Sequence, residues 1–576
     1  MRCPFDPAKA RVRYELRVPE RGRESVMTED DMESGSKGVS ETGVEIGTRT
    51  PGGGVTDVAT GAVAGTTVGV RKDEVRVRPW PRETQDAAGL GRELALVAGI
   101  VAVFVGTRWA AFGAGMRYRV GEAAWLWQLL DLGLLRDHLL RSLWYLHGQP
   151  PLFNAVVGVA EKIAGARFGE VMLGLQLVLG LGAVLAVNRA LGMLRVGIGL
   201  RAVVCVALLL NPVEITFEFD ALYTEIAYAL HCFLALAVVR FLKSRTQREL
   251  WGVAALAVAL TLVRSTYQWV WVAAVFAVLW GMVAERRREI RWAGVVAVGL
   301  AMVWPAKNLF LVGHFTSSTW AASSMAKHWS VNDARVQEFE WAGLIETFPS
   351  GVKSRESSQS WLGERWQTAG RGVPELDALG KEEGGATNWN SLAMLRMHEA
   401  QAKDVGFLLR HDPKPYVVGV VRAVLLYFQD SADYFREVTV EDTVANFRRV
   451  EGVDQRLRRV CCNVFGVPGD SAAARPGLVG HAEGVVGWMC LGAVAVYGFV
   501  VGCGPMLARR TAWLGDQDRR VAVVGMIVTV GYVFVVSNLL DVGENMRFRL
   551  ETQPLMLMAA AILVAQIWDR RKTVRG

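Results

Sequence analysis

Cysteine is scarce in this chain, and its seven residues follow neither the spacing of a metal site nor that of a disulfide framework. Several of them lie inside apolar runs, as Cys205 and Cys232 do. Charged residues make up only 21% of the chain, against 52% hydrophobic residues. The hydrophobic residues gather in runs of about 17 to 24, long enough to cross a bilayer. These features exclude a soluble enzyme, a fibrous protein and a disulfide scaffold.

The N-terminal 90 residues lack a usable apolar period and contain stretches rich in Gly, Thr and charge, such as 48–54. This composition predicts a disordered segment. No apolar core follows the early arginines, so the segment does not resemble a cleaved signal peptide. Met27 is an alternative start to Met1.

Hydropathy predicts an all-α polytopic membrane protein with about ten transmembrane helices. Two further apolar stretches, 151–164 and 416–428, are short, and the second contains Arg422. The ten predicted spans are 93–113, 168–188, 200–215, 221–242, 249–265, 267–284, 292–313, 482–505, 520–541 and 550–568.

The distribution of basic residues predicts the topology. If the two short stretches lie along the interface, five segments on one side of the membrane hold 19 Lys and Arg, and the short turns opposite hold only 3. Arg117, Arg119, Arg136 and Arg141 of the first outer loop weaken this contrast without reversing it. Cytoplasmic loops carry the excess of positive charge, so both termini are expected in the cytoplasm.

This topology divides the chain into five parts with the functional groups facing outward, and we expect the chain in a bacterial inner membrane. The first outer loop, 114–167, is expected to carry interfacial helices because apolar residues recur at helical spacing from Trp125 to Leu135. The parts are a cytoplasmic segment 1–90, a membrane module 91–313, a mostly helical extracytoplasmic domain 314–480, C-terminal membrane helices 481–569 and a basic tail 570–576.

The first outer loop also contains a motif. Glu122 is followed three residues later by Trp125, and His147 is followed by the Pro-Pro-Leu segment 150–152. With these residues the chain resembles the C-type glycosyltransferases, polytopic enzymes that take sugars from polyprenyl-phosphate donors, and within them glycosyltransferase family 39 and the lipid A and protein mannosyltransferase-like group. That family has an acidic pair here, whereas Gly121 occupies the first acid's position in this chain.

Two later outer turns extend the resemblance. The turn 211–225 contains Glu218 and Asp220 after a proline, similar to the family's second acidic turn. The turn 541–554 contains Glu544, Arg547 and Arg549 and resembles a Glu-x-x-Arg segment that precedes the last span in many members. The resemblance implies transfer of a sugar from a polyprenyl-phosphate donor to a lipid, glycan or protein acceptor. Segment 314–480 carries no family motif.

Chemistry alone also leads to the carboxylates and cations among these residues, whereas the substrate contacts are implied by the resemblance. Glycosyl transfer needs a carboxylate to accept the acceptor's proton, and positive charge or a metal to stabilise the departing phosphate. Ionisable groups near membrane spans are costly and are functional candidates by default. The candidates are Glu122, Asp220 and Glu218 for catalysis; Arg547, Arg264 and Lys307 for the donor phosphate; His147, Trp125 and Glu544 for substrate contacts; and Glu122 with Asp220 for a divalent metal, Mg or Mn.

Each candidate also has a structural explanation. Glu122 can cap or solvate a surface helix, His147 can be a buried hydrogen-bonding residue, and Arg264 and Lys307 can snorkel to lipid headgroups. Asp131 and Asp137 are expected on a solvated face. Nucleic acid is not expected as a partner, because the arginines lie beside membrane spans. The alternative functions are a transporter or flippase of lipid-linked sugars, which usually shows paired repeats, and a polysaccharide ligase or polymerase.

The charge asymmetry gives a direct test of the topology. A reporter fused after about residue 350 should be active only when exported, because segment 314–480 is expected outside. The same reporter fused after Arg287 should behave as cytoplasmic. Paired alkaline phosphatase and fluorescent-protein fusions measure this, and the reverse pattern would place the candidate residues on the wrong side of the membrane.

Overall fold

The computed structural model describes residues 87–118, 123–329, 334–347, 359, 362–366, 368–428 and 516–575. They belong to the unit Arg82–Gly576. Its described elements are helical, and the β-pairing among them is one isolated bridge between Gly380 and Thr387. The predicted segment 1–90 and the predicted span 482–505 lie outside the described residues, apart from the start of α1 (Ala87–Gly113).

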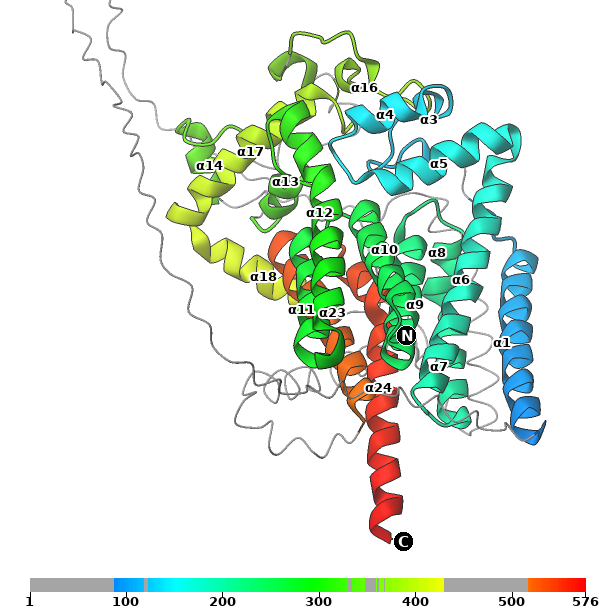
Figure 1. Cartoon of the computed structure of the whole chain (residues 1–576). Helices are drawn as coiled ribbons and strands as arrows, with labels where there is room; N and C mark the ends of the chain where they lie inside the picture. Colours follow the sequence, from blue (N-terminus) through cyan, green and yellow to red (C-terminus); the bar gives the residue numbers. More distant parts are fainter. Residues whose placement is uncertain are drawn as a thin grey trace, which may run out of the picture. The chain divides into compact units, whose positions relative to one another are not determined.

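The long helices form a bundle, with shorter helices gathered at one end of it (Figure 1). α3, α4 and α16 lie at that end, and the C-terminus of α24 lies at the opposite end. The long helices are α1, α6 (Phe168–Met193), α9 (Thr224–Ser244), α10 (Gln247–Val263), α12 (Arg287–Val312), α23 (Gln517–Leu540) and α24 (Asn545–Arg575), joined by the shorter α7 (Ile198–Leu209) and α11 (Trp269–Met282).

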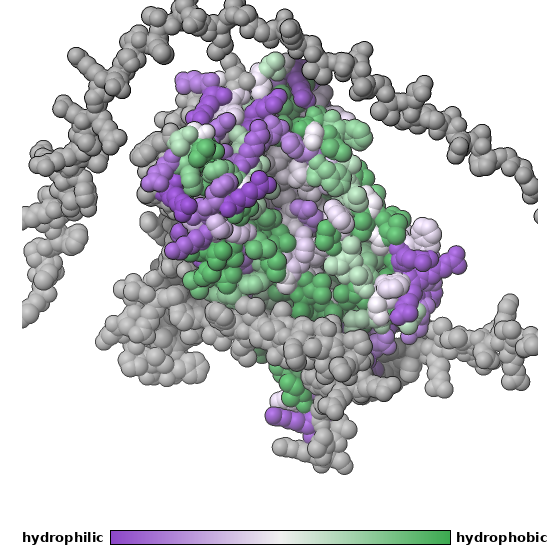
Figure 2. Space-filling view, turned by 90° about the vertical axis from the view of Figure 1, so that its left-hand side faces the viewer, coloured by the Kyte–Doolittle hydropathy of each residue, from purple (hydrophilic) through white to green (hydrophobic). Residues whose placement is uncertain are grey.

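The chain has the helices of a multi-pass membrane protein, which confirms the predicted fold class. Six described helical segments are long and apolar enough to cross a bilayer, whereas α7, α10 and α11 are shorter. Ten spans are therefore not confirmed. Large apolar side chains also point outward from the long helices, among them Phe310, 88% exposed, and Val178, 69% exposed. Figure 2 shows apolar residues gathered over the middle of one face and hydrophilic ones toward its upper part.

The predicted span 200–215 ends earlier than expected. α7 stops at Leu209, and Pro212 begins a separate short helix, α8 (Pro212–Glu218). The side chain of Asn211 caps α8 by accepting a hydrogen bond from the backbone N–H of Val213 at 3.0 Å. Proline suits the first turn of a helix because its missing N–H has no helical partner there. The Asn-Pro pair therefore starts a new helix directly after α7.

The first outer loop folds into short helices that lie across the end of the bundle. α3 (Leu132–Asp137) and α4 (Leu139–Tyr145) precede α5 (Pro151–Ala164), which runs across the top of α6 and joins it through the short 3-10 helix η2 (Gly165–Arg167) (Figure 1). α5 packs closely on α3, because a Cβ added to Gly158 would lie 2.5 Å from the Leu139 side chain and 3.1 Å from the Leu135 carbonyl oxygen.

The described part of segment 314–480 contains several helices and, from 378 to 391, a stretch of turns with one bridge. The short 3-10 helix η3 (Ala284–Arg286) directly precedes α12. Beyond α12, the helices α17 and α18 lead the chain back to the bundle (Figure 1). α18 packs near the ends of α23 and α24, and the hydroxyl of Tyr416 donates a hydrogen bond to the Leu539 carbonyl at 3.0 Å. The helices of this segment are α13 (Ala321–Ala326), α14 (Ala334–Trp341), α16 (Pro374–Asp377), α17 (Leu392–His411) and α18 (Pro413–Tyr427).

Candidate active site

The connection between α23 and α24 is a tight turn that fixes the start of the last helix. Asn545 donates hydrogen bonds from Nδ2 to the carbonyl oxygens of Ser537 and Asp541, at 3.3 and 3.1 Å. Its Oδ1 accepts one from the N–H of Gly543 at 3.0 Å. Gly543 has a φ of +129°, a conformation that side chains rarely tolerate. This turn places Arg547 in the first turn of α24.

Two buried arginines converge on the ring of Tyr223. The guanidinium carbon of Arg264 lies 5.1 Å from the ring centroid, and that of Arg547 lies 5.6 Å from it. Arg264 also lies 4.0 Å from the ring centroid of Phe548. Both arginines are at least 97% buried. Aromatic faces attract cations, so the Tyr223 ring helps to hold two like charges near each other.

Each of the two arginines forms an ion pair with a carboxylate, but the two pairs differ in their exposure to solvent. Arg264 pairs with Glu551, which is fully buried and also accepts a hydrogen bond from the Tyr267 hydroxyl at 3.3 Å. Arg547 pairs with Glu544, whose side chain is 34% exposed. The Arg264 end of this arginine cluster is therefore closed, whereas its Arg547 end is open to solvent.

The outer segment, residues 314–480, reaches the open end of the arginine cluster through Lys327. Lys327, which follows α13, pairs with Asp541 at 2.9 Å. Burial raises the pKa of Asp541 above its ordinary value, and Lys327 offsets part of that effect. Burial also raises the pKa of Glu544, but Arg547, Lys327 and Arg264 outweigh it and hold this pKa below its ordinary value. Glu544 is therefore an anion at neutral pH, surrounded by cations.

The second acidic turn, 211–225, lies beside this cluster, because Tyr223 belongs to it. Glu218 ends α8 and is fully buried in an ion pair with Arg108 of α1, with Nε donating to Oε2 at 2.7 Å. Asp220 is also buried, and its backbone carbonyl accepts a hydrogen bond from Gln176 of α6 at 2.9 Å. Glu218 thus has a structural partner on the first helix, whereas Asp220 is fixed through its backbone.

The structure brings some of the predicted site residues together and separates others. Arg264, Arg547 and Glu544 form one cluster, next to the turn that holds Glu218 and Asp220. Lys307 instead donates to the carbonyl oxygens of Trp144, at 3.2 Å, and Leu146, at the end of α4. Trp125 is partly exposed, and Glu122 lies outside the described residues.

The predicted metal site stays a prediction. Among the residues that the structure describes, no three His, Cys, Asp or Glu side chains converge in a way that would hold a metal ion. Glu122, one of its two predicted ligands, is not among them. Asp220 alone supplies too few ligands for Mg²⁺.

His147 belongs to a polar contact that joins the first outer loop to the outer segment. It is fully buried: its Nε2 lies 2.9 Å from the Asn390 carbonyl oxygen and its Nδ1 lies 3.1 Å from the Thr319 hydroxyl. The carbonyl can only accept, so Nε2 carries the proton and Nδ1 accepts one from Thr319. With both ring nitrogens engaged, His147 acts as a structural residue here.

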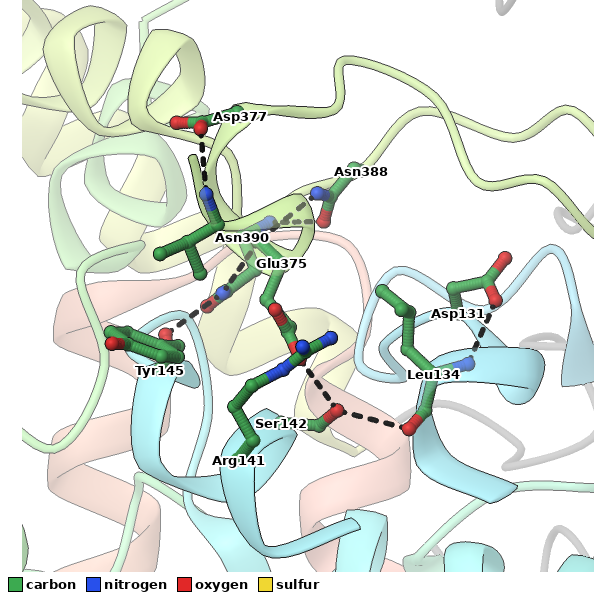
Figure 3. A network of polar contacts seen from close by, with 10 residues as sticks. Asp131, Leu134, Arg141, Ser142, Tyr145, Glu375, Asp377, Asn388 and Asn390 are labelled. Carbon is green, nitrogen blue, oxygen red and sulfur yellow. Dashed lines mark hydrogen bonds and ion pairs between the residues drawn. The ribbon is translucent and has the colours of Figure 1, made fainter. Parts of the chain in front are cut away.

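Asn390 is the centre of this contact, and Figure 3 shows its bonds to Tyr145 and Asn388. Its Oδ1 accepts hydrogen bonds from the N–H groups of His147 and Gly148, at 2.7 and 2.9 Å, and its Nδ2 donates to the Tyr145 carbonyl at 3.0 Å. Nearby, Glu375 accepts from the hydroxyl of Ser142 at 2.9 Å. These bonds lock the turn between α4 and α5 to segment 374–391.

A second link holds the start of the loop. Lys381 donates from Nζ to the carbonyl oxygens of Ala124 and Leu126, at 3.0 and 2.7 Å, and Asp131 accepts from the N–H of Glu383 at 3.0 Å. Asp131 is buried and caps α3, whereas it was expected on a solvated face. Asp137 is exposed, as expected. The chain segment that follows Glu122 is thus held by the outer segment.

Three residues of the site were not among the predicted ones: Tyr223, Glu551 and Arg108. Arg108 and Glu551 stand inside predicted apolar spans, and an ionisable residue in such a span is a functional candidate by default. That signal was present in the sequence. Tyr223 carries no comparable signal, because a tyrosine at the end of a span also suits a lipid headgroup.

Comparisons with known proteins add little. No family model matches the chain, and no curated protein matches it. Among solved structures it is similar to ArnT from Cupriavidus metallidurans in the apo state, with 14% sequence identity and a TM-score of 0.28. The match covers 81% of this chain and 78% of that one. A similarity this low does not indicate an activity for this chain.

Two buried histidines of the contact between loop and outer segment predict sensitivity to acid. Burial lowers the pKa of both His147 and His398 to about 3. The unfolded chain binds these protons near pH 6.5 and the folded chain does not, so stability is full above pH 6.5 and falls as the pH is lowered toward 3. Each histidine should contribute a slope of about 1.4 kcal/mol per pH unit.

The variant His398→Leu should reduce the dependence of stability on pH by the contribution of one histidine, because leucine does not titrate. Leucine should be tolerated at this position, since the His398 ring makes no hydrogen bond with the described residues. Denaturant unfolding in detergent between neutral and acid pH measures the slope for the wild type and the variant. His138→Gln, at an exposed position, is the control and should keep the wild-type slope. Equal slopes for His398→Leu and the wild type would contradict the account.

Proposed function

We propose that the chain is a membrane glycosyltransferase that transfers a sugar from a polyprenyl-phosphate donor to a lipid, glycan or protein acceptor at the outer face of the cytoplasmic membrane. The observation that carries this proposal is the pair of buried arginines, Arg264 and Arg547, on the ring of Tyr223. A departing phosphate gains negative charge as the glycosidic bond breaks, and guanidinium groups placed beforehand stabilise that charge.

The open end of the arginine cluster is where a phosphate would enter. Arg547 is held by Glu544, which is partly exposed and lies on a loop rather than within a helix. A phosphate has the geometry and charge to replace this carboxylate, because both accept paired hydrogen bonds from a guanidinium. Arg264 is less suited to exchange, since its partner Glu551 is fully buried.

The position of the cluster fits a lipid-linked substrate. Arg547 lies in the first turn of a helix long and apolar enough to cross the membrane, and Arg264 directly follows α10. A donor whose chain lies in the bilayer would present its phosphate at this level. A free nucleotide sugar would need a water-filled pocket away from the lipid.

The proton acceptor of the proposed reaction is assigned by the resemblance and by position. Glu122 and Asp220 are the two carboxylates proposed for this role, since Glu218 is neutralised by Arg108. A divalent cation between Glu122 and Asp220 would supply Lewis-acid stabilisation of the phosphate. Trp125 and His147 belong to the same first loop, and we propose that they orient that loop near the acceptor.

A transporter or flippase of lipid-linked sugars is the second candidate function. Its substrate path would need polar groups along the whole depth of the bundle. The predicted site residues that the structure brings together instead lie at the ends of helices, around one turn. A polysaccharide ligase or polymerase would share the arginine cluster and differ in its acceptor.

The role of Arg547 can be tested by donor titration in nanodiscs. Arg547→Ala should weaken donor binding by about tenfold or more, because a hydrogen bond to a charged group contributes roughly 1.5–3 kcal/mol. Arg547→Lys keeps the charge but loses the paired donors, so affinity should fall to an intermediate value. Arg286→Ala, in an ion pair with Glu289 before α12, is the control for loss of one positive charge. Unchanged affinity in Arg547→Ala would mean that Arg264 or Lys307 holds the phosphate.

The proton acceptor can be tested by carboxamide variants. Glu122→Gln should lower turnover by about 100-fold or more, because general-base catalysis is typically worth roughly 10² to 10⁴. Asp220→Asn should act similarly if it completes the site, whereas Asp137→Asn, at an exposed position, should have a mild effect. Initial rates with a labelled polyprenyl-phosphate sugar measure all three. Full activity in Glu122→Gln would move the base to the second acidic turn or to the outer segment.

A further inference from the structure

Three glutamates lie buried together where α8 meets α9. Glu214 and Glu218 belong to α8, Glu225 belongs to the first turn of α9, and each is at most 3% exposed. Three ionised carboxylates in one buried site would repel one another strongly, since the protein interior screens charge poorly. The surroundings of each therefore decide its protonation state.

Glu218 is neutralised by an arginine. Arg108 donates from Nε and Nη2 to the two oxygens of Glu218, the first at 2.7 Å. Its Nη1 is directed away from the glutamates and donates to the Leu209 carbonyl oxygen at 2.8 Å. This bidentate pair leaves the guanidinium committed to one of the three carboxylates.

Glu225 has no such partner. Neither of its carboxyl oxygens accepts a hydrogen bond from any donor in the described part of the chain. The carboxyl of Glu214, the other acid of the cluster, is the neighbour close enough to share a hydrogen bond with it. Two ionised carboxylates have only acceptor atoms, so a hydrogen bond between them needs a proton on one of the two.

Glu218 and Glu225 both approach the backbone of α6 at Gly180. A Cβ added to Gly180 of α6 would lie 2.5 Å from the Oε1 of Glu218 and 3.2 Å from the Oε1 of Glu225. Both carboxyls therefore lie directly over the backbone of α6, in space that the missing side chain leaves. The first turn of α9 favours an anion through its dipole, but that effect is weaker than the cost of burying an unpaired charge.

We propose that Glu214 and Glu225 form a proton-binding site that holds one shared proton at neutral pH. The charged and titratable groups that face it are Arg108 of α1, Glu218 of α8, and Tyr228 and Cys232 of α9. Cys205 of α7 lies behind Cys232. Because Arg108 is committed to Glu218, release of the shared proton leaves Glu225 as a buried anion with no hydrogen-bond donor in the described part of the chain. The site does not depend on the proposed sugar transfer.

Infrared spectroscopy of the full chain in nanodiscs tests this proposal. The wild type should show the carbonyl stretch of a protonated carboxyl at neutral pH, and the band should shift in deuterated water. Glu225→Gln should remove this band, since the glutamine amide replaces the protonated acid and can donate to Glu214. Asp137→Asn is the control and should keep the band, because Asp137 is exposed and pairs with Arg136 as an anion.

The proposal is overturned if the wild type lacks the band, or if both Glu225→Gln and Glu214→Gln retain it. A second measurement needs no variant. A hydrophobic carbodiimide adds to a protonated carboxyl: the acid proton moves to one carbodiimide nitrogen, and the carboxyl oxygen bonds to the central carbon. Mass spectrometry should locate the adduct on Glu214 or Glu225, with less adduct as the pH is raised. Adducts confined to other carboxyls would contradict the proposal.

Discussion

The structure depends on one constraint, that a charge buried in the bundle needs an opposite charge beside it. The ion pair between Arg264 and Glu551 is an example. Both side chains are almost fully buried among helices that cross a membrane. An ion in such surroundings costs several kcal/mol unless another charge answers it, and removal of one partner of a buried pair typically costs about 3–5 kcal/mol. The pair therefore joins the end of α10 to α24, which are almost 290 residues apart in the chain.

Other buried arginines follow the same rule, and their partners lie on other helices. Arg108 of α1 reaches the buried Glu218 of α8, and Arg201 of α7 reaches Glu93 of α1, whose side chain is 42% exposed. Each of these charges has a partner from another helix, so the bundle and its charges form together. Glu225, whose carboxyl oxygens accept no hydrogen bond from a donor in the described part of the chain, is the acid that we propose shares a proton with Glu214.

The same constraint separates stabilising charges from functional ones. Arg264 is closed in by Glu551, Tyr267 and Phe548, whereas Arg547 has a partner that reaches solvent. Lys307 and His147, predicted to contact substrate, instead hold backbone groups of the first outer loop in place. Asn390 and Lys381 hold that loop from the outer segment. The loop is thus positioned by a part of the chain in which no family motif was found.

Hydropathy was enough to predict most of the helices. Nine of the ten predicted spans coincide with described helices, and the tenth, 482–505, lies outside the described residues. The break at Pro212 was missed as a helix start, because an apolar run hides the short α8 that follows it. The partners of the charges were not predictable from sequence. Glu551 lies within an apolar span and Tyr223 resembles a headgroup anchor, so only the packing of α9, α10 and α24 shows that both meet Arg264.

The central claim is that this cluster breaks a bond between a sugar and a lipid phosphate. The most direct measurement incubates the purified chain in nanodiscs with a polyprenyl phosphate that carries a radiolabelled sugar, then separates lipid from water-soluble and acceptor fractions. The account predicts that label leaves the polyprenyl phosphate in the presence of the wild-type chain. Label that stays on the lipid while it moves between the two leaflets would contradict the account and identify a flippase.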